Sequence, residues 1–570
     1  MTGIRVWAPF ASHVDAIIGE RTEPMTPDGR EYWRIDLAHG TDYLISVDGG
    51  VPRPDPRSAH QPHGVHGPSR VFDTSQFSWT DASWNGIEVL GGVIQEVHVG
   101  TWTPEGTLDA AITRLDHLVD LGVDTVELMP LASFAGDHGW GYDGAFWYAV
   151  HEAYGGPAAL QRFVDAAHAH GIAVCLDVVY NHFGPAGNYT STFGPYTTDR
   201  YTTPWGDAIN LDGQHSRGVR NFICDNALRW FTEFHIDALR LDAVQTLHDS
   251  STEHILAELS RRVEAARHSL PQQVVLIAES DLNQVRMVTP RSDGGLGIDA
   301  QWNDDVHHAI HAYLTDESFG YYVDFGSPEV LSKALEKVFV HDGGYSTFRG
   351  TNWGAPVDTT VDRRRFVVFT QDHDQIGNRG MGDRPDEAIP PGAVAGGIAL
   401  VMLSSYTPML FQGQEWGTRT PFRFFTDHDP ELGALVTQGR LREFATHDWA
   451  SVYGTEALFP DPQDPETFRG SHIDWNELDE PYHAEMYGWY KQLIALRRAY
   501  LRGIGTPVVT DHGHGWFRMV NGPLTVIVNP GQHPCSPAES RGRLLASWGE
   551  VTVGDQSVSM GTHSVAVLGE

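Results

Sequence analysis

The sequence predicts an α/β protein: a (β/α)₈ TIM barrel with an N-terminal β-sandwich and a small C-terminal β domain. Three observations lead to this fold class. Over roughly 400 residues, apolar strand-like segments alternate with helical segments, as in a parallel barrel. No Gly-x-Gly-x-x-Gly follows the first of these strands, which disfavours a dinucleotide-binding doubly wound sheet. Short β runs between Gly, Pro and Asp clusters flank the alternating region on both sides.

Three domains are expected from these changes of pattern. Residues 1–90 hold short strand-like runs and predict the N-terminal β-sandwich. Residues 91–501 are assigned to the barrel. Within it, the long interval near 181–216 is rich in Gly, Pro, Tyr and Asn and predicts a loop subdomain on the active face. Residues 502–570 return to short β runs and predict the C-terminal β domain.

The barrel prediction depends on eight apolar strand candidates with helical patterns between most of them. The strand candidates span 93–99, 125–131, 173–180, 238–244, 274–281, 297–302, 366–373 and 408–414. Helical spacing of apolar residues predicts helices at 108–121, 157–170, 217–234, 252–268, 327–340 and 391–405, and a last one at 483–501.

Composition excludes several classes of protein. The chain has 570 residues, 41% of them apolar, which is enough to bury a large core and excludes intrinsic disorder. Its 39 basic and 74 acidic residues give a net charge of −35, so no nucleic acid and no membrane surface is expected as a partner. Gly precedes none of the lysines (Lys333, Lys337, Lys491), so a P-loop is absent and nucleotide-hydrolysing classes are disfavoured.

No targeting segment, metal site or cofactor is predicted. The first residues lack an apolar signal-peptide core, so a cytoplasmic location is expected. The three cysteines are too scattered for a disulfide framework. His307 and His311 have helical spacing, but no third ligand accompanies them, so a polar helix face is favoured over a zinc site.

Carboxylates at three predicted strand ends are the candidate catalytic residues. Asp242, Glu279 and Asp374 each follow an apolar strand. Active sites of such barrels lie at the carboxyl ends of the strands. Because an isolated carboxylate is costly to bury, its repeated placement at strand exits predicts catalysis.

The surroundings of two of these carboxyls suit glycosidic bond hydrolysis. That reaction needs one ionised carboxylate and one proton-bearing carboxyl. Arg240, two residues before Asp242 on the same strand face, would keep Asp242 ionised. Glu279 leaves an apolar strand and is better placed to keep its proton. A carboxyl separation of about 5–5.5 Å would then indicate retention of configuration.

These residues belong to four ordered segments that resemble the motifs of the α-amylase superfamily. The segments are Asp177–His182, Arg240–Asp242, Glu279, and His373–Asp374. The resemblance implies retaining chemistry on α-glucans, with Asp242 as nucleophile, Glu279 as acid and then base, and Asp374 as a ligand of sugar hydroxyls. It also implies substrate-binding roles for Arg240, His182, His373 and Tyr142, the last as an aromatic ring under the reacting glucose.

Longer strings are similar to the maltooligosyltrehalose trehalohydrolases. They lie at 139–156, 201–213, 301–305, 374–379 and 415–417. This resemblance implies cleavage of the α-1,4 bond next to the terminal trehalose of maltooligosyltrehalose, with release of trehalose. It implies no cofactor, and it implies a maltooligosyltrehalose synthase as the pathway partner.

Three further residues are substrate-binding candidates. Gln245 stands in Ala243-Val244-Gln245-Thr246, where many α-amylases have Lys-His, and this difference suggests an altered +1 subsite; a His would be expected at 245 in a trehalohydrolase. Trp302 is interpreted as a loop aromatic able to stack on a sugar. Glu415 lies in one of the matching strings. The loop after the third strand has no dense Asp cluster, so the calcium site common in α-amylases is not predicted.

Two other functions stay open at this point. A branching or debranching enzyme also pairs a β-sandwich with this barrel but acts at α-1,6 bonds, and product analysis separates it. A non-catalytic glucan-binding or regulatory protein could share the fold; the loss of a carboxylate would indicate it, whereas Asp242, Glu279 and Asp374 are all present.

Overall fold

Eight parallel strands close into a barrel in the computed structural model, which describes the chain apart from residues 30, 446–451, 455–457, 504, 539, 555–556 and 570. Hydrogen-bonded neighbours follow the order β12-β15-β16-β17-β20-β21-β8-β9, and β9 pairs again with β12. Each strand lies within one residue of a predicted segment, and the predicted fold class is confirmed. The strands are β8 (Ile94–Val97), β9 (Thr125–Leu128), β12 (Ala173–Val178), β15 (Ala238–Leu241), β16 (Val275–Ala278), β17 (Ala300–Trp302), β20 (Phe366–Val368) and β21 (Thr407–Phe411).

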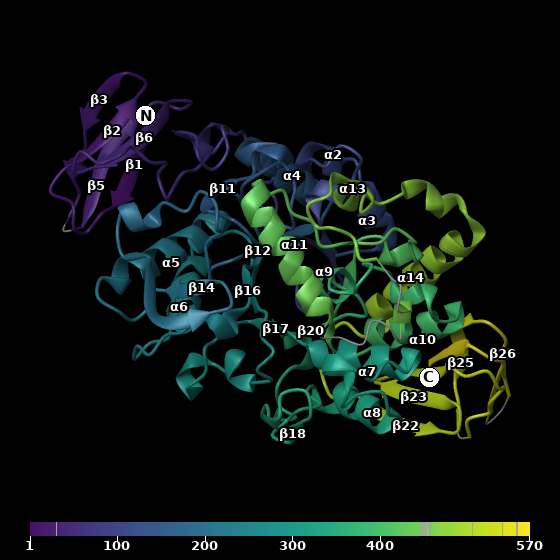
Figure 1. The fold of residues 1–570 in the computed structure, drawn as a ribbon. Coiled ribbons are helices and arrows are strands. Elements are labelled where there is room, and N and C mark those ends of the chain that lie inside the picture. Colours follow the sequence, from purple (N-terminus) through teal and green to yellow (C-terminus); the bar gives the residue numbers. More distant parts are fainter. Residues whose placement is uncertain are drawn as a thin grey trace.

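Helices surround the barrel at nearly every predicted position (Figure 1). They are α4 (Gly156–Ala169), α5 (Ser216–Glu233), α6 (Ile255–Arg267), α7 (Asp304–Thr315), α8 (Pro328–Lys337), α10 (Pro391–Met402) and α14 (Pro481–Tyr500). Helix α11 (Pro430–Ala445) has no counterpart among the predicted helices. Exposed leucines such as Leu435 and Leu441 lie along this helix. Its apolar residues therefore do not form one buried stripe, and the sequence pattern does not reveal the helix.

The predicted helix over 108–121 is wrong as a single element. The structure has α2 (Leu108–Ile112) and α3 (Leu115–Leu121) instead. The Thr113 hydroxyl donates to the Ala110 carbonyl at 2.7 Å, a local bond that competes with continued helical hydrogen bonding. The apolar spacing carries through the break, which is why the sequence pattern does not reveal it.

Strand-rich regions lie at the two ends of the chain, on opposite sides of the barrel (Figure 1). The first is a pair of small antiparallel sheets, β1-β5-β4 and β3-β2-β6-β7. The second is a five-stranded sheet, β22-β23-β24-β28-β25, with the pair β26-β27. Their strands are β1 (Thr2–Trp7), β2 (Val14–Ile18), β3 (Arg21–Pro24), β4 (Thr26–Pro27), β5 (Tyr32–Leu37), β6 (Asp42–Val47), β7 (Ser69–Arg70), β22 (Val509–Gly513), β23 (Trp516–Asn521), β24 (Leu524–Asn529), β25 (Arg543–Trp548), β26 (Val551–Val553), β27 (Val558–Met560) and β28 (Ser564–Gly569).

Helix α10 joins the barrel to the C-terminal sheet. Its sequence is apolar all round and eleven of its twelve residues are buried, as expected for a helix covered on every side. A side chain at Gly396 would come within 2.4 Å of Val528 on β24, so the close approach of helix and sheet requires glycine there.

Loops at the carboxyl ends of the strands build the active face. The interval near 181–216 contains the hairpin of β13 (Thr197–Thr203) and β14 (Gly206–Ile209). A second hairpin, β18 (Tyr345–Ser346) with β19 (Thr351–Asn352), lies between β17 and β20. Within the described part of the chain, no helix is both long and apolar enough to cross a bilayer.

Candidate active site

One buried arginine organises the carboxylates at the carboxyl ends of the strands. Arg240 on β15 is fully buried and lies opposite Asp177 of β12 in the strand register. Its Nη1 donates to Asp177 Oδ2 at 2.8 Å and to Asp242 Oδ1 at 2.7 Å, and its Nη2 lies 3.6 Å from Glu279 Oε2. The structure therefore brings Arg240, Asp242 and Glu279 together, as the sequence predicts.

Both oxygens of Asp242 are held by protein donors. Arg240 binds Oδ1, and the Asn181 side-chain amide donates to Oδ2 at 2.7 Å. The same amide donates to the Asp242 carbonyl at 2.8 Å, which ties the strand exit of β15 to that of β12. An ionised carboxylate held by two donors in a fixed direction is suited to act as a nucleophile.

Glu279 is set up to carry a proton. It follows β16 and accepts a hydrogen bond from the Ala243 backbone N–H. Burial raises the pKa of Glu279 to about 8; the negative charge of Asp242 contributes to the rise, and Arg240 opposes it. Ala243 has a left-handed φ of +40°, which is unusual for alanine and directs its N–H toward Glu279. The two carboxyls thus have the different environments that an acid and a nucleophile require.

A chain of hydrogen bonds crosses the floor of the site. Glu96 on β8 accepts hydrogen bonds from the backbone N–H and the ring Nδ1 of His373. The other ring nitrogen lies 2.8 Å from the Tyr142 hydroxyl, which donates to Asp177 at 2.6 Å. Burial alone would lower the pKa of His373, but Glu96 and Asp374 raise it to about 10. The imidazolium can therefore donate to Tyr142 and fix the direction of its hydroxyl.

The remaining motif residues lie at the rim. His182 bonds to Asn181 and stacks on the indole of Trp205, with ring centroids 4.3 Å apart. Trp205 comes from the β13–β14 turn and is 47% exposed. Asp374 is also 47% exposed and accepts a hydrogen bond from Asn378 at 3.1 Å. Gln245 lies on the turn Val244–Thr246, and its Oε1 has no partner among the described residues.

A cavity of about 250 Å³ lies at the Asp374 side of the site. Its polar lining includes Asp304, Asp374 and the ion pair of Arg349 with Asp281 (3.1 Å), and its aromatic lining includes Phe348. Asp304 makes no hydrogen bond or ion pair with the residues that the structure describes. Mixed polar and aromatic walls of this kind suit a sugar, which presents hydroxyls at its edges and apolar faces.

Trp302 is not on a loop, contrary to the sequence interpretation. It is the last residue of β17 and is 2% exposed, because the strand extends through it and turns its ring into the barrel. There it lies under the Arg240 guanidinium, with the central carbon 4.4 Å from the ring centroid. The structure places it beneath the ion cluster and away from the surface that a sugar could contact.

Glu415 lies outside the barrel, and the structure does not bring it to the site. It is fully buried and accepts hydrogen bonds from Gln95 and His117, both at 2.9 Å. Since neighbouring strand residues point to opposite faces and Glu96 points inward, Gln95 points outward with Glu415. Its match to a family string thus reflects packing of the barrel wall.

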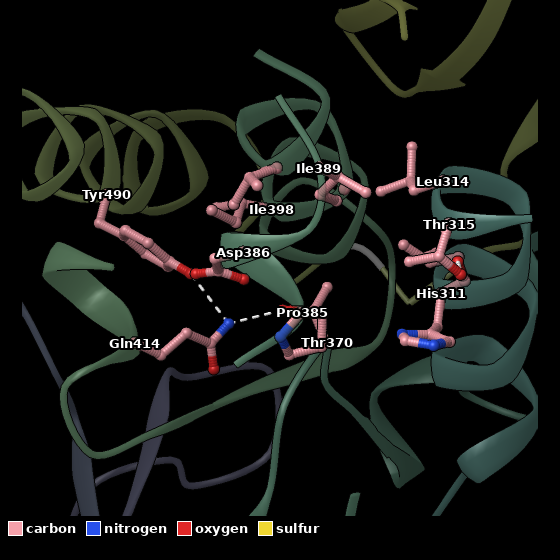
Figure 2. A pocket seen from close by; sticks show the side chains of 13 residues that line it. His311, Leu314, Thr315, Thr370, Pro385, Asp386, Ile389, Ile398, Gln414 and Tyr490 are labelled. Carbon is pink, nitrogen blue, oxygen red and sulfur yellow. Dashed lines mark hydrogen bonds between the residues drawn. The ribbon is translucent and has the colours of Figure 1, made fainter. Parts of the chain in front are cut away.

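Amides after the eighth strand have a similar structural role (Figure 2). Gln414 donates to the Tyr490 hydroxyl at 2.8 Å and to Thr370, and these contacts join α14 to the barrel wall. They border a cavity of about 30 Å³, lined mainly by apolar side chains of α7 and α10. Asp386 and His311 also line it. Its lining includes none of the active-site carboxylates Asp242, Glu279 and Asp374.

Sequence reasoning does not identify Glu96 or the free carboxylate of Asp304. Glu96 is a single acid inside a buried strand, and this isolated charge is the sequence feature that could have indicated a role in the site. His307 and His311 share a face of α7, but that face is buried rather than an exposed polar face: His307 bonds to the Thr370 carbonyl, and His311 pairs with Glu317 at 2.7 Å. Among the described residues, no group of potential ligands is arranged to hold a metal ion.

The chain is similar to known proteins both in sequence and in fold. Residues 68–201 match the family described as alpha amylase, catalytic domain. The chain is 48% identical to a malto-oligosyltrehalose trehalohydrolase of Arthrobacter ramosus, over 99% of this chain and 98% of that protein. A 1,4-alpha-glucan branching enzyme of Bacillus cereus is 30% identical, over 55% of this chain and 54% of its own. Among solved structures, a putative alpha amylase from Salmonella typhimurium superposes with a TM-score of 0.90 at 33% identity, covering 100% of this chain and 97% of the other.

Proposed function

Because the chain belongs to the malto-oligosyltrehalose trehalohydrolase family, we propose that it hydrolyses the α-1,4-glucosidic bond next to the terminal trehalose of maltooligosyltrehalose. The observation that carries the proposal is the Arg240 cluster, in which one guanidinium contacts both Asp242 and Glu279. Glycosidic hydrolysis by two carboxyls requires such a pair, with one ionised and one protonated.

The proposed reaction retains configuration. The Asp242 carboxylate attacks the anomeric carbon while Glu279 gives its proton to the departing glycosidic oxygen, so that trehalose leaves and a β-glucosyl ester remains. Water then gives a proton to Glu279 and its oxygen to the anomeric carbon, which releases the maltooligosaccharide and restores both carboxyls. Asp374 would bind ring hydroxyls, and Tyr142 would lie against the reacting glucose.

The leaving trehalose is assigned to the region between the turn that carries Gln245 and the cavity at Asp304, whose charge acts on Glu279. The general acid must lie beside the departing oxygen. The leaving sugar is therefore expected next to Glu279, on the side away from Asp242. Gln245 follows Asp242 on the turn that carries Ala243, and its unpartnered Oε1 can accept from a sugar hydroxyl. Asp304 likewise offers a carboxyl group that none of the described residues binds.

Product analysis tests the activity. Maltotriosyltrehalose and maltopentaose both contain five glucose units and differ only in the last linkage, so their rates isolate recognition of the trehalose end. Much faster cleavage of the first, with trehalose as product, is the expected result. Equal cleavage of both would indicate a general amylase, and new α-1,6 bonds would support the branching alternative. A debranching enzyme would leave both substrates intact and would cleave an α-1,6-branched glucan, whereas turnover of none of the three would support the non-catalytic alternative.

The pH dependence of kcat/KM should report the acid. Glu279 must be protonated to act, and its pKa in the free enzyme is raised to about 8. We therefore expect kcat/KM to hold through neutral pH and to fall as the pH rises through about 8. Steady-state kinetics on maltotriosyltrehalose between about pH 5 and about pH 10, a range that brackets the Glu279 pKa of about 8, would show this fall in rate. A fall that begins near the ordinary glutamate pKa would contradict the assigned role.

Two neighbouring acids provide a matched test of the cavity. Asp305 accepts hydrogen bonds from Asn283 (2.9 Å), Val340 N (2.7 Å) and His341 N (3.2 Å), whereas Asp304 has no such partner. Asp304→Asn should therefore lower kcat/KM for maltotriosyltrehalose by roughly 10-fold without lowering thermal stability. Asp305→Asn should cost about 1–3 kcal/mol of unfolding free energy and leave the preference for the trehalose end unchanged. Calorimetry and kinetics of both variants would separate the two roles; unchanged kinetics in Asp304→Asn would exclude the cavity as the trehalose site.

The substrate also indicates a place in metabolism. A maltooligosaccharide with a trehalose end must come from a reaction that converts its reducing-end linkage, so a maltooligosyltrehalose synthase is proposed as the supplier. A cytoplasmic location is proposed with it.

A further inference from the structure

The loop that follows Asp242 has almost no secondary structure of its own. After β15 the chain forms the short turn Val244–Thr246 and then runs without helix or strand to α6, which begins at Ile255. This loop, residues 243–254, carries Gln245 and the Ala243 N–H that binds Glu279. Its position must therefore be set by side-chain contacts, since regular backbone bonding does not set it.

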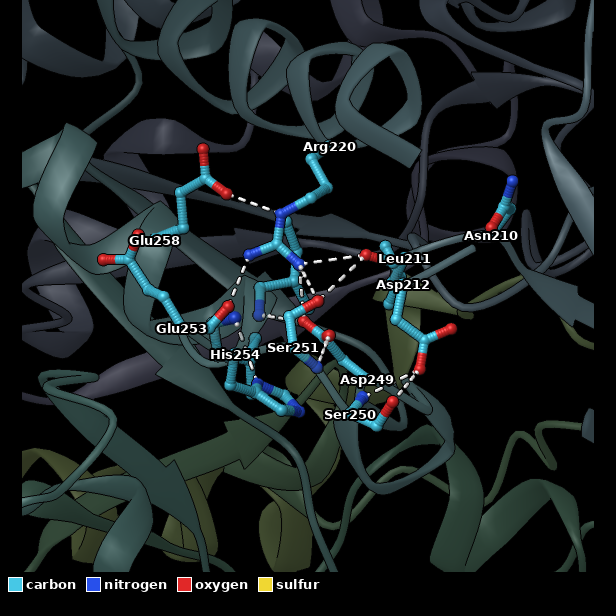
Figure 3. Close-up of polar contacts among 12 residues, drawn as sticks. Asn210, Leu211, Asp212, Arg220, Asp249, Ser250, Ser251, Glu253, His254 and Glu258 are labelled. Atoms are coloured by element: carbon cyan, nitrogen blue, oxygen red, sulfur yellow. Dashed lines mark hydrogen bonds and ion pairs between the residues drawn. The ribbon is translucent and has the colours of Figure 1, made fainter. Parts of the chain in front are cut away.

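Arg220 on α5 holds the far end of this loop (Figure 3). Its Nη1 donates to Asp249 Oδ2 at 2.7 Å, and its Nη2 donates to the Glu253 carbonyl at 2.6 Å. Its Nε donates to Glu258 on α6 at 2.6 Å. The planar fork thus fixes two points of the loop and the first turn of the next helix in one geometry.

The same guanidinium also reaches the loop subdomain. Arg220 Nη1 donates to the Leu211 carbonyl at 3.1 Å, just after the β13–β14 hairpin. Next to Leu211, Asp212 accepts hydrogen bonds from the Ser250 N–H at 2.9 Å and from the Tyr201 hydroxyl at 2.7 Å. The Tyr201 ring stacks on His248, with centroids 5.1 Å apart. The two loops are therefore joined at several points.

Burial makes this junction specific. Arg220 is 8% exposed and the Asp249 side chain is fully buried. Desolvation opposes ionisation of Asp249, but hydrogen bonds from Ser251 and Arg220 hold its pKa below the ordinary value. A buried charged pair that also binds backbone carbonyls loses several contacts at once when the arginine is replaced.

We infer that Arg220 is a positioning residue for recognition of the trehalose end. It clamps the Gln245 loop against the segment that follows the β13–β14 hairpin, so that Gln245 keeps a fixed position in the acceptor region. Arg220 itself is buried behind these loops, and it contacts neither Asp242 nor Glu279 in the structure. The inference rests on the proposed function, because it assigns a part of the site that only the leaving trehalose would occupy.

Arg220→Lys and Arg220→Gln test this inference. Lysine keeps the charge but cannot bind Asp249, Glu258 and both carbonyls together, because it lacks the fork. We expect the ratio of kcat/KM for maltotriosyltrehalose to that for maltopentaose to fall roughly 5-fold in the lysine variant and 10-fold or more in the glutamine variant. The larger part of the change should be in KM for the trehalose substrate. An equal loss on both substrates would show a purely structural role and overturn the inference.

Arg497→Lys is the matched control. Arg497 is also buried. Among the described residues it donates only to backbone carbonyls, those of Gly91, Met402, Ser404 and Tyr406, near the amino-terminal ends of β8 and β21. Its replacement should lower thermal stability and leave the substrate ratio unchanged. A similar change of ratio in this control would mean that general destabilisation explains the result.

Tyr201→Phe covers the case in which the Arg220 variants fail to fold. It removes only the hydroxyl bond to Asp212 and keeps the ring on His248. We expect the ratio to fall by roughly 2–4-fold, because one hydrogen bond to a carboxylate is lost. An unchanged ratio would overturn the inference. If the unmodified protein itself shows no preference for maltotriosyltrehalose, the proposed function is wrong. If the unmodified protein shows the preference and the Arg220 and Tyr201 variants keep it unchanged, the proposed function stands and only the positioning role of Arg220 is wrong.

Discussion

Asp242→Ala should lower kcat on maltotriosyltrehalose by roughly 10⁴-fold, or about 5 kcal/mol of transition-state stabilisation, with little change in fold. The nucleophile forms a covalent bond that no neighbouring group can replace, because Asp177 is held by Arg240 and Tyr142. Arg240 would still have Asp177 as a buried partner, so removal of Asp242 leaves no unpaired charge. Single-turnover and steady-state kinetics would measure the loss, and thermal unfolding would confirm the fold.

A small anion distinguishes a nucleophile from a merely structural acid. Azide can occupy the space left by the Asp242 carboxylate and attack the anomeric carbon from the same face, which would give a β-glucosyl azide and restore turnover. Asp237→Asn is the matched control at the opposite end of the same strand. Asp237 accepts bonds from Trp84, His168 and Val174, so its replacement should reduce stability and change kcat only a few-fold. Full activity of Asp242→Ala without azide would contradict the mechanism.

The barrel could be predicted from sequence because its strands are buried on both faces. Such strands read as apolar runs, and a polar residue at the end of a run is conspicuous. Asp242 and Glu279 were found in this way, since each directly follows Leu241 or Ala278 at a strand exit. Periodicity was less informative for Trp302, because an aromatic residue before a polar segment reads equally well as the end of a strand or the start of a loop.

Contacts between distant segments could not be predicted from spacing. Glu96 and His373 are 277 positions apart, and only closure of the barrel through β21 and β8 brings them together. Glu415 shows the reverse limit: a matching string indicates that a residue is needed by the fold family, but it does not tell whether the side chain faces the substrate or the barrel wall. Arg220 binds two backbone carbonyls, and a carbonyl acceptor leaves no mark in the sequence.

Glu279→Gln should lower kcat on maltotriosyltrehalose by roughly 10³-fold, because the departing trehalose oxygen then receives no proton. With an aryl α-maltotrioside, whose leaving group needs no proton, the first step should be much less affected and the second step should become limiting. A burst of released phenol in rapid-mixing kinetics would show the accumulated glucosyl-enzyme. Asp242→Ala should give no burst, so the two variants separate the roles of the two carboxyls.

The same variant should be more stable than the unmodified protein at neutral pH. Glu279 has a folded-state pKa raised from 4.5 to about 8, so the unfolded chain ionises this group first as the pH rises. The folded state therefore loses stability relative to the unfolded state between these two values, and glutamine removes that loss. Below about pH 4.5 the carboxyl is protonated in both states, and the advantage of the variant should disappear. Melting temperatures of both proteins would measure this difference at about pH 4, below the ordinary glutamate pKa, and at about pH 7, between that value and the folded-state pKa. Equal melting temperatures at both pH values would mean that the proton on Glu279 is not held by its burial, and the assignment of the acid would then have to move to another carboxyl of the Arg240 cluster.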